Sequence, residues 1–148
     1  MRTIQTHTRY VKWLSPEEMH NESQEWLSEL RFMKDEHLFF EDLVKSYTLQ
    51  LISPEKFSHN AEIIEAINKS RKKNGLLIKA IIVHINNLKI MVDGIDQIEE
   101  EEAYKKEHRR LTLENSDQLR KYRILKTQLF DIIKNIKKEE KHPLIDKE

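Results

Sequence analysis

Side chains suited to a helical core recur at alternating spacings of three and four residues along most of this 148-residue chain. Because an α-helix completes a turn in about 3.6 residues, such a row falls on one face of a helix, in the pattern typical of helices that pack side by side. In the first third of the chain the row consists of Met19, Ser23, Trp26, Leu30, Met33, His37, Phe40, Val44, Tyr47 and Leu51. Two further rows follow it, so we predict an all-α protein.

Turn signals are few, and they divide the chain into three long helices. The sequence contains two glycines and three prolines, whereas a β-sandwich needs a turn signal about every dozen residues. Ser15-Pro16 and Ser53-Pro54 are typical helix starts, in which serine caps the helix and proline occupies the first turn. Asp93-Gly94 is a typical helix end. The predicted helices span approximately residues 16–51, 54–93 and 97–137.

One pattern within the second predicted helix suggests instead that the helix ends near Gly75. Lys72-Lys73-Asn74-Gly75 is also typical of a helix C-terminus, with basic residues in the last turn followed by a glycine. A break there would give four helices, and a kink at Gly75 is an intermediate outcome. The row of core residues keeps its phase through Gly75, which favours one continuous helix.

Short turns between long helices predict an antiparallel up-down-up bundle with the crossing angle of about 20° found in coiled coils. A chain of this length fits one domain. We assign residues 15–138 to the bundle, residues 1–14 to an extended N-terminal arm and residues 139–148 to a frayed or disordered tail.

The charge balance and the absence of cysteine narrow the classes of function. Twenty-six basic and 26 acidic residues cancel, which argues against a dedicated DNA-binding domain. With no cysteine, disulfides, thiolate metal sites and thiol nucleophiles are excluded. The most apolar stretch, 76–92, contains Lys79 and His84 and would not span a membrane. Since the first fifteen residues lack the apolar run of a secretory signal, we expect a cytoplasmic protein.

The apolar surplus of the predicted bundle indicates self-association. A single rod of three helices has little interior, yet the first helix carries Phe32, Phe39 and Leu43 in addition to its core row. No serine, threonine or lysine has a credible partner base, and there is no glycine-rich phosphate loop. We therefore expect no cofactor and predict a non-enzymatic interaction or scaffold protein, with a homodimer favoured and a further protein partner as an option.

A metal-binding bundle of the ferritin-like or hemerythrin-like kind is the alternative. Counting residues from each turn puts His84 and His108 in one layer, near His20 and Glu17 of the first helix. Histidine and carboxylate side chains that point inward are the usual ligands of such sites. A di-iron bundle needs two Glu-x-x-His steps, however, and within the predicted helices only Glu17–His20 has this spacing. Hydrogen-bonded core histidines are the competing interpretation.

Two polar sets fall near the middle of the predicted rod. The first interrupts the core rows, where polar residues usually fix the register of helices, and consists of His37, Ser70, Arg71, Asn74, Asn115, Gln118 and Tyr122. The second is a basic belt, a hypothetical site for an anion or nucleic acid, formed by Arg31, Lys34, Lys72, Lys73, Arg120, Lys121 and Arg123. Because Glu29, Asp35 and Glu36 are interleaved with the belt, a solvated charged face with pairs of opposite charge is the usual interpretation of such a pattern.

Overall fold

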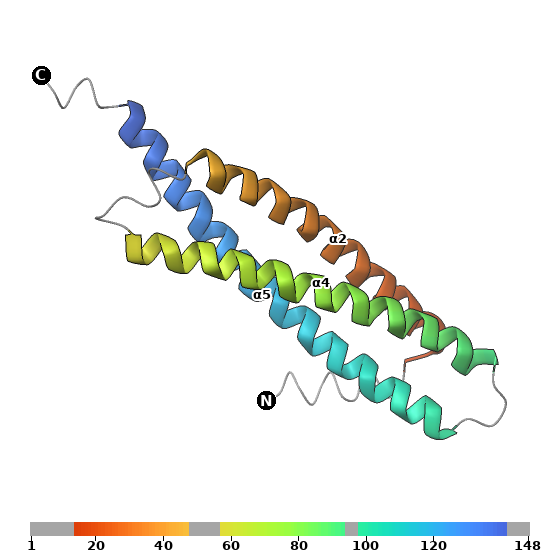
Figure 1. Cartoon of the computed structure of the whole chain (residues 1–148). Coiled ribbons are helices and arrows are strands. Elements are labelled where there is room, and N and C mark those ends of the chain that lie inside the picture. The colour runs from red at the N-terminus through yellow and green to blue at the C-terminus, as the bar shows by residue number, and fades with distance from the viewer. Residues whose placement is uncertain (1–13, 48–56, 94–97, 142–148) are drawn as a thin grey trace, which may run out of the picture.

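The computed structural model describes residues 14–47, 57–93 and 98–141, and in these ranges it contains three long helices and no strand. The helices are α2 (Pro16–Ser46), α4 (Phe57–Asp93) and α5 (Ile98–Lys141). They run alternately up, down and up along one elongated bundle (Figure 1). The predicted all-α three-helix architecture is confirmed.

The helix ends differ from the predicted ones by a few residues. Helix α2 ends at Ser46 rather than near residue 51. Tyr47 still donates its backbone N–H to the Leu43 carbonyl at 3.1 Å, but its own backbone dihedral angles are no longer helical. The described part of α4 begins at Phe57, and residues 54–56 of the predicted helix lie outside the described ranges. Helix α5 continues to Lys141, into the segment predicted to be a tail. The other residues of that tail, and residues 1–13 of the predicted arm, lie outside the described ranges.

The start of α2 has the predicted cap. The hydroxyl oxygen of Ser15 accepts a hydrogen bond from the Glu18 backbone N–H at 3.1 Å, and the same hydroxyl donates to the Glu18 carboxylate at 3.0 Å. Pro16 occupies the first turn, where its missing N–H costs nothing. Leu14, the residue before the Ser15 cap, is buried against Met19 and Leu88. The Ser15 cap therefore marks where α2 begins, and the buried Leu14 side chain holds the residue before the cap against the bundle.

Helix α4 is continuous through Gly75, so the predicted alternative of a break is wrong. The core row on both sides of the glycine packs against the other helices, and this packing outweighs the local end signal. A methyl group placed on Gly75 would meet no heavy atom within 4 Å. The glycine is thus a weak point of a continuous helix, without a packing role in the described structure.

Gly75→Ala is expected to raise the free energy of unfolding by about 0.5–1 kcal/mol. Alanine restricts the unfolded chain and favours helix, and here it adds no clash. Urea unfolding of the variant and of the natural sequence, followed by circular dichroism, measures the difference. A lower unfolding free energy for Gly75→Ala would contradict a regular helix at this position.

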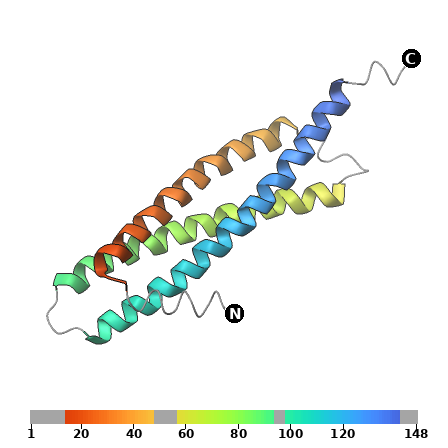
Figure 2. The ribbon, with the colours of Figure 1, turned by 180° about the vertical axis from the view of Figure 1, so that it is seen from behind.

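The core is shared by all three helices. The main cluster of buried apolar side chains comprises Trp26, Leu27, Leu30, Met33, Phe40, Ile63, Ile67, Leu77, Ile81, Ile85, Leu111, Tyr122, Leu125, Leu129 and Ile133. Of the predicted core row, Arg71 is instead exposed and pairs with Glu41 of α2, because a guanidinium at the rim of the core keeps its hydration. Seen from behind, α4 and α5 draw apart toward the end where α4 begins and α5 ends (Figure 2).

Candidate functional site

A chain of hydrogen bonds connects the three helices near one end of the bundle. The Glu22 carboxylate of α2 lies 2.8 Å from Nε2 of His108 on α5, and Nδ1 of His108 lies 2.9 Å from Nε2 of His84 on α4. The aromatic ring of Tyr104 stacks on His84 with centroids 4.0 Å apart, and Trp26 lies against His108. Both histidines are buried. We call Glu22, His108 and His84 the histidine chain.

The chemistry of the three side chains decides which atom donates and which accepts in each hydrogen bond of the histidine chain. An ionised carboxylate can only accept, so His108 donates its Nε2–H to Glu22. In a neutral imidazole the other nitrogen is then an acceptor, and His108 Nδ1 accepts the Nε2–H of His84. His84 Nδ1 is left with a lone pair, and no hydrogen-bond partner for this buried atom is present in the described structure.

Burial keeps both histidines neutral near pH 7. Desolvation, and after it the neighbouring His108, lowers the pKa of His84 from 6.5 to about 4. Burial also lowers the pKa of His108, although its hydrogen bond to Glu22 acts in the opposite direction. A neutral, fully oriented pair of this kind ties three helices together without placing a charge in the core.

The structure brings together two of the four predicted metal ligands. His84 and His108 are adjacent, but Glu17 is exposed and His20 is half-buried, and no hydrogen bond of the described residues joins either to the pair. The described part of the chain holds no group of three or more histidine or acidic side chains placed to bind a metal ion. Because the hydrogen bonds occupy all ring nitrogens except His84 Nδ1, the pair matches the competing interpretation of hydrogen-bonded core histidines.

Sequence reasoning missed Glu22, the carboxylate that completes the chain. A signal was present, since Glu22 lies beside the buried Ser23 and four residues before Trp26, on the face of α2 that packs against the other helices. The Glu-x-x-His motif pointed to Glu17 instead, because this motif relates a glutamate to a histidine of the same helix, here His20. The contact that matters joins residues 86 positions apart and depends on how the helices pack.

The predicted polar set in the middle of the rod does connect helices. His37 Nε2 of α2 lies 2.9 Å from the Ser70 hydroxyl of α4, and Gln118 of α5 donates to the Ser70 carbonyl at 3.1 Å. Asn74 donates to the Leu30 carbonyl at 2.9 Å. Burial lowers the pKa of His37 as well. Such bonds between helices hold their relative register, as expected for polar residues in a core row.

Three of the seven basic-belt residues are paired with carboxylates. Lys73 of α4 lies 2.6 Å from Glu114 of α5, and both Arg120 and Lys121 pair with Asp117, at 2.8 and 2.9 Å. The other four are exposed, namely Arg31, Lys34, Lys72 and Arg123. The pairing reduces the local positive charge available to an anion, and anion binding at the belt stays a prediction.

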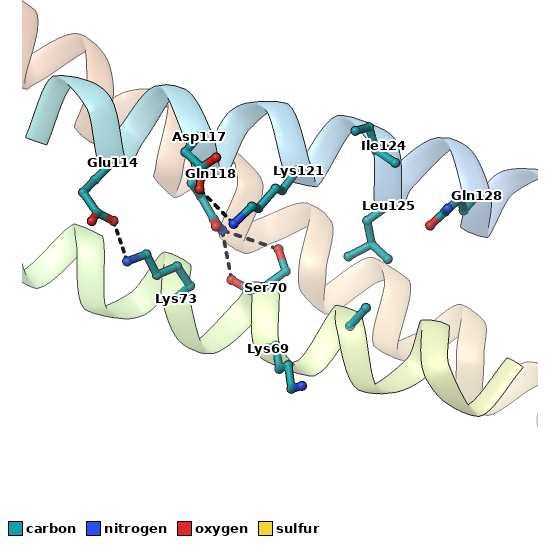
Figure 3. A pocket seen from close by; sticks show the side chains of 11 residues that line it. Lys69, Ser70, Lys73, Glu114, Asp117, Gln118, Lys121, Ile124, Leu125 and Gln128 are labelled. Carbon is teal, nitrogen blue, oxygen red and sulfur yellow. Dashed lines mark hydrogen bonds and ion pairs between the residues drawn. The ribbon is translucent and has the colours of Figure 1, made fainter. Parts of the chain in front are cut away.

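Three hollows lie along the line between α4 and α5, and we refer to them together as the α4–α5 groove. The largest has a volume of about 680 Å³, and Figure 3 shows the Lys73–Glu114 ion pair and the Gln118–Ser70 bonds that cross it. The other two, about 420 and 300 Å³, share His84, Asn87 and Glu107 as lining residues. These two hollows adjoin the histidine chain, whereas the largest of the three lies on the other side of it, nearer the middle of the bundle.

The fold and the site together define an antiparallel three-helix bundle held by a buried histidine chain, with an open groove between two of its helices. None of the helices, in the ranges described, carries an apolar stretch long enough to cross a lipid bilayer. Comparison of the chain with protein-family models, curated proteins and solved structures found no match.

Proposed function

We propose that this protein is a non-enzymatic helical interaction module that acts through self-association. The observation that carries the proposal is a row of large apolar side chains on the outer face of α4. Leu76, Val83 and Ile90 follow one another at intervals of seven residues, and 64%, 56% and 68% of their surfaces are exposed. Several large apolar side chains exposed along one face of a helix are typical of an interaction site.

A second exposed apolar pair lies on α2 and supports contact with a further protein. Phe32 and Phe39, also seven residues apart, are 63% and 54% exposed. Leu43, which the sequence analysis grouped with them, packs instead against the core from a half-buried position. Besides these two phenylalanines, α2 also exposes Leu38, at 50%.

The histidine chain has a structural role under this proposal. His84 and His108 are bonded to each other, enclosed by Tyr104 and Trp26, and held in their neutral forms by burial. A residue that exchanges protons with a substrate needs a pKa near the working pH and access to the reacting atom. The pKa of His84, about 4, lies far below a working pH near 7, so His84 does not meet the first requirement.

Size-exclusion chromatography with light scattering tests self-association directly. With rising protein concentration, the measured mass is expected to increase from the 17.9 kDa of one chain toward twice that value. A mass that stays at one chain up to high micromolar concentration would remove the proposal.

A further inference from the structure

The apolar row on α4 is symmetric about its central residue. Leu76 and Ile90 lie seven residues before and after Val83, which places the two ends about 21 Å apart on a helix that rises 1.5 Å per residue. Ala80 and Asn87, on the same face, carry short side chains between the large ones. Val83 and Ile90 also line the two hollows beside the histidine chain. A helix approaching this row would meet alternating large and small side chains.

Such a row is complementary to its own antiparallel copy. A two-fold interface brings residue i of one chain against residue j of the other, and j against i. With the axis at Val83, Leu76 of each chain lies opposite Ile90 of the second copy. The three apolar side chains of each α4 then cover those of the other.

The charges beside the row favour the antiparallel orientation. Lys79, four residues before Val83, comes level with Asn87 of the second copy, four residues after it. Asn87 shares a hollow with two acidic residues of α5, Glu100 and Glu107. Glu107 already pairs with Arg110 and shares the other hollow with Lys79 of its own chain. Lys79 of the second copy therefore approaches Glu100, whereas a parallel pair would set the two Glu100 side chains at the same level.

We infer that a second copy of this chain docks with its α4 antiparallel to α4, about a two-fold axis at Val83, along the edge of the α4–α5 groove. This inference rests on the self-association proposed above and adds the surface and the orientation.

Cysteine cross-linking tests the arrangement. Because the natural chain contains no cysteine, only the introduced cysteines can form cross-links. Val83→Cys is expected to link to itself on oxidation or with a short bismaleimide. Leu76→Cys and Ile90→Cys alone are expected to link at least about tenfold more slowly, since identical positions lie about 21 Å apart in the proposed dimer. A mixture of these two variants, one carrying a size tag, is expected to form the mixed dimer. Phe32→Cys on α2 is the control, at 63% exposure.

Val83→Glu adds an independent measurement. The side chain is 56% exposed, so the helix content by circular dichroism is expected to remain unchanged. Two carboxylates meeting at the axis are expected to weaken dimerisation by about tenfold or more. Unchanged dimerisation of Val83→Glu would contradict the proposed axis.

The outcomes separate the inference from the proposed function. If the natural chain dimerises but Phe32→Cys links and Val83→Cys does not, the docking surface is wrong and self-association stands. If each of the three α4 variants links to itself equally well, the pair is parallel and the orientation is wrong. If the natural chain is monomeric and no variant links, both the proposed self-association and the inferred docking surface fail. The apolar row of α4 would then be covered by residues 1–13 or by another protein.

Discussion

Lowering the pH from 6.5 to 4 is expected to reduce the free energy of unfolding by about 3 kcal/mol through His84 alone. Its pKa is about 4 in the folded protein and 6.5 when unperturbed, so between these values the unfolded chain binds a proton that the folded chain excludes. The stability is fully present above pH 6.5 and falls by about 1.4 kcal/mol per pH unit as the pH decreases. Burial lowers the pKa of His37 and His108 too, and both act in the same direction.

His84→Gln provides the matched comparison for this pH dependence. The glutamine amide can donate to His108 Nδ1 but does not titrate. In urea unfolding between pH 6.5 and 4.5 the variant is expected to lose stability more slowly, by about 1.4 kcal/mol per pH unit. Above pH 7 the two slopes are expected to coincide. Identical slopes in both ranges would show that His84 is accessible to protons in the folded protein.

Leu111→Ala is expected to lower the free energy of unfolding by about 2–5 kcal/mol. Leu111 of α5 is fully buried in the main core cluster, so truncation removes apolar contacts and leaves a cavity between helices. Domains of this size are typically stable by about 5–15 kcal/mol, and the loss is a large share of that. Thermal and urea unfolding followed by circular dichroism measure it.

Leu113→Ala is the control on the same helix, two residues further along. This leucine is 37% exposed, and the same truncation is expected to cost less than about 1 kcal/mol. Equal losses for the two variants would mean that the packing face of α5 is assigned incorrectly.

Local patterns in the sequence sufficed for most of the fold. The core row of α2 from Met19 to Phe40 is buried as predicted, because spacing along a helix determines which side chains share a face. The Ser15 cap formed because its partner, Glu18, is only three residues away. The ends of α2 and α5 were less predictable, since the competition between helix and turn there depends on what the last residues pack against.

Spacing along single helices and the number of residues between turns were enough to favour three helices, to place the start of the first at Ser15, and to put His84 and His108 in one layer. The packing of the helices against one another was needed to establish that Glu22 rather than Glu17 bonds to His108, that Arg71 stays outside the core, and that Leu76, Val83 and Ile90 remain exposed beside a groove. These outcomes depend on the rotation of each helix about its own axis. That rotation is set by packing among all three helices, and the pattern within one helix leaves it open.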